Sequence, residues 1–253
     1  MNFRVVAKTD KGIIKKVNQD SLLYKHARYK GAEIVMAIIC DGMGGLEKGE
    51  LASGAVVKKF CEWFDKKITF RLNDLNLNAI AKEWEDMLEE INKRMLSYSK
   101  EKSISMGTTF TGILFVDDDY LLVHVGDTRL YYIDSYIKQL TTDHTFIERE
   151  IRSGRLSPSE AKKDKRRNML LQCVGASKNL RVELKTGIIK SGVYLLCSDG
   201  FRHELTEAEM LEYLAIKELK DKKEMANRLE YLIELVKKRM EKDNISAILI
   251  KAE

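Results

Sequence analysis

Proline and cysteine are scarce in this chain. Its 253 residues include one proline, Pro158, which excludes collagen-like, proline-rich and linker-dominated architectures. The four cysteines, Cys40, Cys61, Cys173 and Cys197, are widely separated, lie in apolar stretches and form no CxxC pair. Disulfide frameworks and zinc sites usually show paired spacing, so we expect buried, reduced thiols.

Long hydrophobic runs are also missing. The best apolar runs, 34–40 and 193–197, have the length of strands, whereas a membrane-spanning helix needs about 20 apolar residues. Residues 1–10 contain no sustained apolar region of the kind that a signal peptide requires. We therefore expect a cytoplasmic protein that does not bind membranes.

Neither sign of charge dominates the composition. Lys and Arg number 44 against 39 Asp and Glu, and outside residues 162–167 the basic residues alternate with acidic ones. That pattern is typical of solvated helix faces and does not favour nucleic-acid binding. The hydrophobic share of 44% is too high for a disordered chain. Because there is no repeat, linker or heptad seam, we expect a single domain over residues 1–253 and a monomer.

Apolar segments of strand length recur along the chain. They are rich in β-branched residues and cover residues 3–7, 21–29, 33–40, 108–116, 120–125, 130–133, 181–188, 193–197 and 245–250. Several are joined by only a few turn-type residues, and 116–120 is predicted to form a hairpin turn. Short connections require antiparallel pairing, because a parallel crossover needs a dozen residues or more. We predict antiparallel sheets.

Longer segments with helical spacing of apolar residues separate these strands. They cover residues 51–66, 78–98 and 144–153, and a tail at 207–238 that contains two helices. This order lacks the regular alternation of strand and helix that a doubly wound parallel fold requires. We therefore predict an α+β fold in which helices cover packed antiparallel sheets.

Five aspartates stand at the ends of predicted strands. Asp41 and Asp199 follow buried strands and precede glycine, and Asp127 follows another strand. Asp20 and Asp243 lie just before strands. Carboxylates at such positions are costly unless they are paired or bind a cation, and several at one mouth repel one another. A divalent cation removes that repulsion.

The chemistry of these oxygens narrows the choice of metal. Oxygen ligands without a cluster of His or Cys favour Mg²⁺ or Mn²⁺ over zinc. Taken singly, each Asp-Gly pair is more often a simple turn than a ligand. The glycines at 42, 44 and 45 allow a tight turn, but their spacing matches neither common nucleotide-binding loop.

Seven short motifs occur in one order along the chain. They are Asn18-Gln19-Asp20, Asp41-Gly42-Met43-Gly44-Gly45, Met106-Gly107-Thr108-Thr109, Val125-Gly126-Asp127-Thr128-Arg129, Thr142-Asp143-His144, Cys197-Ser198-Asp199-Gly200 and Asp243-Asn244-Ile245-Ser246. In this order and spacing the sequence resembles the metal-dependent protein phosphatase family, the PP2C-like serine/threonine phosphatases of bacterial type. The resemblance extends over residues 5–250.

The resemblance implies a fold and a metal site. The fold would be a four-layer α-β-β-α sandwich, with two central antiparallel sheets flanked by helix pairs. Two Mn²⁺ or Mg²⁺ ions would lie at one end of the sandwich. Asp41 would bridge them, the Gly42 carbonyl would contact one ion, and Asp199 and Asp243 would bind the other.

The same resemblance assigns supporting roles and a reaction. Asp20 would hold metal-bound waters, and Asp127, with Asp199, would bind a third and weaker ion. A water bridging the two ions would hydrolyse phosphoserine or phosphothreonine in phosphorylated protein substrates, opposing a cognate serine/threonine kinase. No covalent phosphoenzyme is expected, because no cysteine is followed by arginine at the spacing of cysteine phosphatases.

Some positions depart from the family pattern. Lys15 stands where an arginine commonly binds the substrate phosphate, and lysine lacks the bidentate fork of arginine. Adjacent Lys16 competes for that role, and a merely solvated lysine is an equal alternative. Gln19 replaces a common Glu, which lowers the negative charge of the site but still allows hydrogen bonds to a bound water. Met43 cannot donate a proton, unlike the His of many eukaryotic members, and His144 is expected to be structural.

Residues 152–168 correspond to the flap beside the family's active site. This segment contains Pro158 and the basic run Lys162-Lys163-Asp164-Lys165-Arg166-Arg167. Two interpretations have equal standing. A basic flap would attract phosphoproteins electrostatically, an effect that salt would screen, whereas a charge run is also typical of a solvated helix surface.

Two other functions stay open at this point. A catalytically weak or silent phosphoprotein-binding module on the same fold would be favoured by loss of Asp41, Asp199 or Asp243, and all three are present. A phosphatase for small-molecule phosphates would be favoured by a deep enclosed pocket, which the sequence does not decide. Trp63 and Trp84 lie on helical patterns and are predicted to be core residues.

Overall fold

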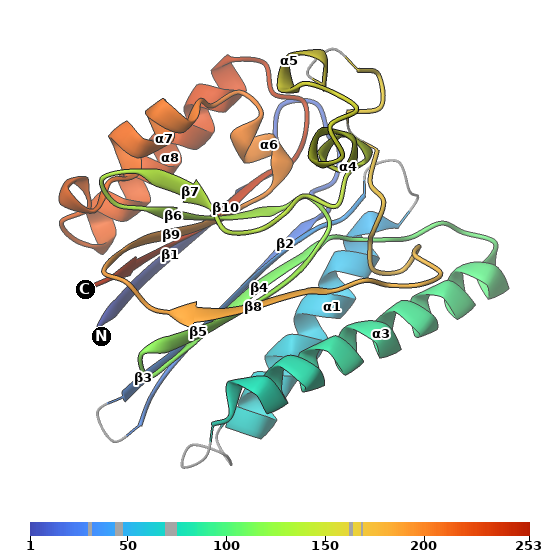
Figure 1. Cartoon of the computed structure of the whole chain (residues 1–253), viewed down its shortest axis with the longest axis horizontal. Helices are drawn as coiled ribbons and strands as arrows, with labels where there is room; N and C mark the ends of the chain where they lie inside the picture. The colour runs from blue at the N-terminus through green and yellow to red at the C-terminus, as the bar shows by residue number, and fades with distance from the viewer. Residues whose placement is uncertain (30–31, 44–47, 69–74, 162–163, 168) are drawn as a thin grey trace.

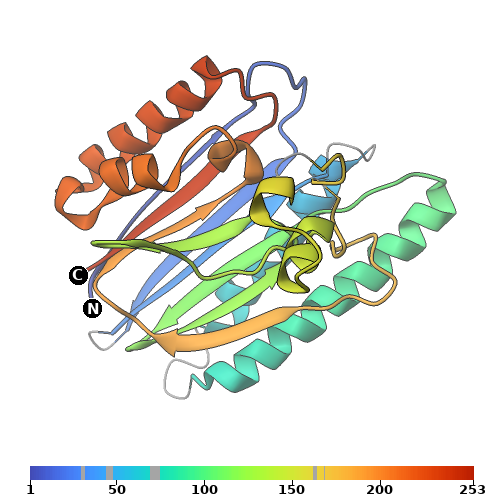
Figure 2. The same ribbon diagram turned by 45° about the horizontal axis from the view of Figure 1, so that its top comes forward.

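Two five-stranded sheets form the middle of the molecule. The computed structural model describes residues 1–29, 32–43, 48–68, 75–161, 164–167 and 169–253 (Figures 1 and 2). The first sheet has the order β1 (Phe3–Asp10), β10 (Ile245–Ala252), β9 (Gly192–Cys197), β6 (Arg129–Ile133) and β7 (Ile137–Gln139). The second has the order β2 (Asp20–Tyr29), β3 (Ala32–Asp41), β4 (Phe110–Val116), β5 (Asp119–Val125) and β8 (Glu183–Ile188). All neighbouring strands are antiparallel, as predicted.

A pair of helices covers the outer face of each sheet (Figure 1). Helices α7 (Glu207–Leu214) and α8 (Lys222–Lys238) pack on the first sheet, and α1 (Gly49–Trp63) and α3 (Leu77–Lys102) pack on the second. The shorter elements are η1 (Phe64–Ile68), α4 (Phe146–Arg152), α5 (Pro158–Ala161), α6 (Asp199–Arg202) and η2 (Ile216–Glu218). The predicted four-layer sandwich is confirmed. Among the described helices, none combines the length and the apolar character needed to cross a membrane.

Strand β3 shows how the alternation of side chains contributes to two apolar layers. Its residues point to opposite faces in turn. Ile38 and Cys40 join the cluster under α1 and α3, whereas Val35, Ala37 and Ile39 join the cluster between the two sheets. Because both faces of this strand are buried, it has the continuous apolar sequence of a central strand rather than an alternating one.

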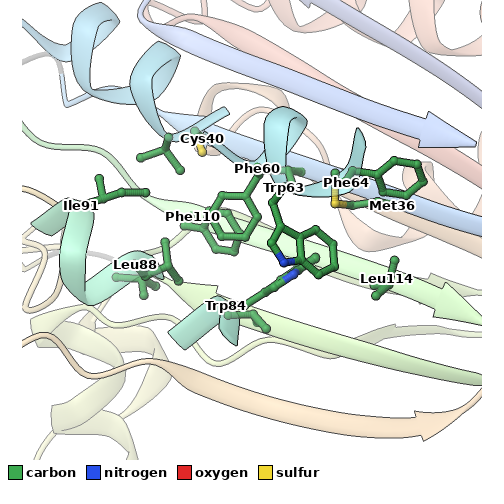
Figure 3. Close-up of a cluster of buried hydrophobic side chains, with 14 of the residues drawn as sticks. Met36, Cys40, Phe60, Trp63, Phe64, Trp84, Leu88, Ile91, Phe110 and Leu114 are labelled. Carbon is green, nitrogen blue, oxygen red and sulfur yellow. The ribbon is translucent and has the colours of Figure 1, made fainter. Parts of the chain in front are cut away.

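Aromatic side chains fill the layer between the second sheet and its helices (Figure 3). Trp84 of α3 is fully buried and meets Trp63 of α1 edge to face at 5.4 Å between ring centroids. Phe60 of α1 and Phe110 of β4 stack against the same group. The prediction that both tryptophans are core residues is confirmed, and truncation of such a ring typically costs about 3–5 kcal/mol.

Local details separate the confirmed predictions from the missed ones. The hairpin at 116–120 is confirmed, since Val116 pairs with Asp119 and Asp117 adopts the left-handed φ of 53° that a tight turn needs. Strand β7 was not predicted, because its three residues are too short to show a period. The expectation that every thiol is buried is wrong for Cys61 of α1, which is partly exposed.

Candidate metal centre

The five strand-end aspartates are close enough to interact electrostatically. The ends of β1, β3 and β9 and the start of α6 lie at the end of the sandwich away from the chain termini (Figures 1 and 2). Asp20 and Asp41 are direct cross-strand partners where β2 begins and β3 ends. Asp199 opens α6 after β9, and Asp243 lies just before β10, the neighbour of β9. Asp127 lies in the turn between β5 and β6. Residues more than 200 positions apart in the chain thus share one acidic site.

Burial and repulsion from neighbouring carboxylates oppose ionisation of three of these acids. Burial raises the pKa of Asp41 well above its ordinary value, and the charges of Asp20, Asp199, Asp127 and Asp243 add to the rise. Burial and the Asp199 charge also raise the pKa of Asp127 to about 7. The pKa of Asp20 rises to about 7 for the same two reasons. A divalent cation would reverse this effect, because it stabilises the ionised carboxylates.

Unpartnered oxygens mark where such a cation fits. Both carboxylate oxygens of Asp20 and Oδ1 of Asp199 are buried without a hydrogen-bond partner among the described residues. The Ser246 and Ser198 hydroxyls partly lower the pKa of Asp20, although neither forms a hydrogen bond of ordinary geometry with it. Buried carboxylate oxygens that lack a donor are costly, so this donor set fits hard divalent ions.

Glycine at position 42 allows the backbone next to Asp41 to pack closely against two other backbone segments. A Cβ atom at residue 42 would lie 2.4 Å from the carbonyl oxygen of Gly49 and 2.5 Å from that of Gln19. The Gly42 amide donates to the Gln19 carbonyl at 3.1 Å, and the Met43 amide is hydrogen-bonded in turn. No side chain fits at position 42 without backbone movement. Gly44 and Gly45 lie outside the described residues.

Asn244 holds the loop between β1 and β2 against the site. Its Nδ2 donates to the carbonyls of Lys11 and Val17, and its Oδ1 accepts the amide of Gln19. The loop in turn brings Lys15 Nζ to 2.7 Å from Asp243 Oδ1. These bonds fix the backbone next to Asp20, which begins β2, and next to Asp243, which precedes β10.

The structure distinguishes the two candidate lysines of this loop. Burial lowers the pKa of Lys15, but its hydrogen bond to Asp243 and the charges of Asp41 and Asp199 outweigh that effect, so the pKa lies above its ordinary value. Lys16 is exposed to solvent. Lys15 is therefore the lysine that the fold places at the acidic site.

An arginine pair supports the Asp127 turn. Arg129 Nε and Nη2 donate to both carboxylate oxygens of Asp143, at 2.9 and 2.6 Å, and Gln139 donates to the same acid. Arg202 Nη2 donates to the Asp127 carbonyl and lies 3.8 Å from both the Asp127 and Asp143 carboxylates. Arg202 was not predicted as a site residue, although its place three residues after Asp199 was a usable signal.

Glu50 and His203 also reach the edge of the site and were missed. Gln19 Nε2 donates to Glu50 Oε2 at 3.2 Å, so the amide that replaces a common Glu is oriented by helix α1. His203 Nε2 lies 3.8 Å from Asp199 Oδ2, and its Nδ1 lies 3.8 Å from Glu241 Oε2. The spacing of four residues between Asp199 and His203 is a helical one that the sequence contained.

A second group of potential ligands lies beside the Asp127 turn. The ligand atoms of His124, His144 and Glu183 lie within 4.8 Å of one another. Thr111 bonds Nδ1 of His124, and Nε2 of His124 faces the carbonyls of Gly126 and Thr142. With both ring nitrogens engaged, His124 has no lone pair to offer a metal.

His144 has a structural contact of the kind expected from the sequence. Its Nδ1 accepts the Gly126 amide at 3.2 Å, and its ring lies 4.9 Å from that of His124. Burial lowers the pKa of His144 and brings the pKa of His124 to about 4, with repulsion from His144 adding to the latter shift. Neutral imidazoles therefore support the turn that carries Asp127.

The chain that follows residues 152–168, the predicted flap, is hydrogen-bonded to the backbone around His144. The Phe146 amide bonds the Met169 carbonyl, and the Leu171 amide bonds the His144 carbonyl. Arg166 pairs with Asp164 and stacks on the Phe146 ring at 4.1 Å, so one cation of the basic run is engaged within the segment. Lys162 and Lys163 of that run lie outside the described residues.

The arrangement is that of an oxygen-rich centre for hard divalent ions at the end of an α-β-β-α sandwich. Residues 14–249 match the model of a family described as protein phosphatase 2C. The chain belongs to this family, as its motifs predicted. It is a protein serine/threonine phosphatase of the divalent-metal-dependent kind.

Individual relatives agree with this assignment. The serine/threonine phosphatase stp of Listeria monocytogenes is 28% identical over 224 residues, which are 86% of this chain and 84% of that protein. The crystal structure of the serine/threonine phosphatase Stp1 from Staphylococcus aureus has a TM-score of 0.86 at 25% identity and covers 100% of this chain and 96% of that one. The PstP catalytic domain in complex with two manganese ions has a TM-score of 0.76 at 25% identity, covering 98% and 97%.

Proposed function

We propose that this chain hydrolyses phosphoserine and phosphothreonine in proteins with two Mn²⁺ or Mg²⁺ ions held by its strand-end acids. The observation that carries the proposal is the convergence of five carboxylates, three of whose oxygens are buried without a hydrogen-bond partner among the described residues. An acidic site of this kind is unfavourable without cations and becomes favourable with them.

The acids divide the binding task. Asp41 would contact both ions and the Gly42 carbonyl one of them, while Asp199 and Asp243 would bind the other. Asp20 would orient water in the site. When bound, the ions would supply a water of lowered pKa and would neutralise charge on the phosphoryl oxygens.

Two further residues tune the site. Asp127, with Asp199, would hold a third ion more weakly than the other two, because Arg202 already lies 3.8 Å from the Asp127 carboxylate. Lys15 would bind the substrate phosphate, and its ion pair with Asp243 keeps it in place before substrate arrives. When the substrate phosphate replaces Asp243 as the partner of Lys15, the new ion pair compensates for the lost one.

Protein substrates suit this site better than small phosphates. The Asp243 side chain is 39% exposed, so the acidic centre opens to solvent rather than into an enclosed cavity. The silent-module alternative is disfavoured, because Asp41, Asp199 and Asp243 are all present. We further propose a monomeric, cytoplasmic, single-domain enzyme over residues 1–253 that opposes a serine/threonine kinase.

The test is turnover of a phosphothreonine peptide by metal-stripped protein with Mn²⁺, Mg²⁺, Ca²⁺ or no added metal. We expect activity with Mn²⁺ or Mg²⁺ only, and a fall of at least about a thousandfold in Asp41→Asn, whose neutral amide is a poor bridging ligand. The matched control is Asp65→Asn, an exposed acid on η1 that is paired with Lys25. Metal binding without turnover by the folded wild type would instead support the silent module.

A further inference from the structure

The loop between β1 and β2 exposes bulky apolar side chains beside the acidic site. Ile13, Ile14 and Val17 are 42%, 61% and 52% exposed. Single exposed apolar residues are normal on protein surfaces. Three of them within five positions, at the edge of a catalytic site, require a different account, because their exposure costs solubility without serving the fold.

The position of these residues follows from their neighbours in the chain. Gly12 lies against Asp243, where an added Cβ would stand 2.3 Å from the Asp243 carbonyl oxygen, and Lys15 pairs with the Asp243 carboxylate. Ile13 and Ile14 connect these two contacts. Since consecutive Cα atoms are about 3.8 Å apart, neither isoleucine backbone is farther than that from a residue that contacts Asp243.

The loop is held in one conformation although it lacks regular structure. Gly12 has a left-handed φ of 76° and donates its amide to Asp10 Oδ1 at 2.7 Å. Asn244 bonds the carbonyls of Lys11 and Val17. A surface that is ordered in advance loses little conformational entropy when a ligand covers it. The exposed apolar side chains are therefore held in an ordered loop, where a ligand can cover them at little entropic cost.

We propose that Ile13, Ile14 and Val17 form an apolar rim that binds the substrate chain next to the phosphoresidue. The apolar rim selects phosphoproteins that carry a bulky apolar residue beside the phosphoresidue. The inference rests on the proposed function. Continuity with the site argues for the substrate as the occupant, because a chain whose phosphate reaches Lys15 must pass the adjacent isoleucines. Exposed Lys11 precedes the rim and exposed Lys16 lies within it, and both disfavour cationic neighbours in the substrate.

The experiment compares two phosphothreonine peptides of equal charge that differ only in Leu or Ser on both sides of the phosphothreonine. We expect the wild type with Mn²⁺ to show a kcat/KM about tenfold higher for the Leu peptide, the size expected from partial burial of apolar side chains. In the Ile13→Ser/Ile14→Ser double variant this ratio should fall below about twofold. Turnover of p-nitrophenyl phosphate, which is too small to span the rim, should stay unchanged.

Ile188→Ser is the matched control. Ile188 is 71% exposed on β8, and its substitution should leave the peptide ratio at the wild-type value. An equal preference in wild type and double variant would overturn the apolar rim while leaving the phosphatase intact. No turnover of p-nitrophenyl phosphate by the wild type would overturn the proposed function and the rim with it. Dimerisation of the wild type that the double variant abolishes would identify a second copy as the occupant and also overturn the rim.

Discussion

Two neighbouring groups of potential metal ligands differ in how their polar atoms are satisfied. The strand-end acids leave both oxygens of Asp20 and one of Asp199 buried without a partner in the described part of the chain. In the second group, His124 bonds a hydroxyl and faces two carbonyls, and Glu183 accepts the Thr142 amide while pairing with Lys185. By residue type alone, the second group resembles a zinc site more closely.

We propose that unmet hydrogen bonds, rather than ligand identity, distinguish the metal site from the second group. A buried polar atom without a partner costs roughly 1–3 kcal/mol, and more if it is charged, so it needs a compensating ligand. A group whose atoms are already bonded would have to break those bonds before it could bind an ion. We therefore propose that the acids form the metal site and that the histidines support it.

Removing one potential ligand from each group should give the largest difference between the two groups, measured as Mn²⁺ affinity. We expect Asp199→Asn to weaken Mn²⁺ binding about a hundredfold or more, because it removes a carboxylate that would contact the ions. Glu183→Gln should leave the affinity within about twofold. Isothermal titration calorimetry of metal-stripped protein measures both. Equal losses in the two variants would contradict the comparison.

Truncation of the scaffold should affect stability instead of metal binding. His124→Ala removes the hydrogen bonds of the ring to the Thr111 hydroxyl and to the Gly126 and Thr142 carbonyls and opens a cavity, which should lower the free energy of unfolding by about 2–4 kcal/mol. His26→Ala, at a partly exposed histidine, should cost less than about 1 kcal/mol. Urea denaturation reports the difference. A stable His124→Ala protein with impaired Mn²⁺ binding would reverse the assignment.

The two groups should also give opposite pH dependences in chelator-treated protein. The folded-state pKa of Asp20, about 7, exceeds its unfolded value, so this acid reduces stability as the pH rises from about 4 to 7. The folded-state pKa of His124, about 4, lies below its unfolded value, so its contribution to stability is lost as the pH falls from about 6.5 to 4.

Substitutions in the two groups should therefore change the pH dependence of the unfolding free energy in opposite directions. Over this window Asp20→Asn should make unfolding free energy rise more steeply with pH, and His124→Ala should make it rise less, each by up to about 1.4 kcal/mol per pH unit. Added Mn²⁺ should remove the unfavourable effect of Asp20 in the wild type. Urea midpoints measured between pH 4 and 8 test this, and parallel curves for the three proteins would refute it.

The smallest expected effect concerns the two adjacent lysines. Lys15→Gln should raise KM for a phosphothreonine peptide roughly tenfold without weakening Mn²⁺ binding, because it removes a charge-assisted phosphate contact and frees Asp243. Lys16→Gln should change KM less than about twofold, since Lys16 is exposed. Steady-state kinetics at fixed salt compares them. A larger effect at Lys16 would transfer the role to that residue.

Local pattern predicted most of the fold. The long helices α3 and α8 and the apolar strands β3 and β9 were visible because periodicity and composition act over many residues. Strand β7 and helices α5 and α6 were not, since three or four residues show no period and depend on their neighbours. Cys61 was expected to be buried from its apolar surroundings, but the helix turns it outward.

The sequence by itself determined that acids stand at strand ends, that these acids offer oxygen ligands, and that seven motifs follow the order of one phosphatase family. Those properties are local, so they can be read along the chain. Only the tertiary structure decided that Lys15 and not Lys16 contacts Asp243, that Arg202 supports Asp127, and that both ring nitrogens of His124 are engaged. Such facts depend on contacts between distant segments, whose geometry is set by how the two sheets pack.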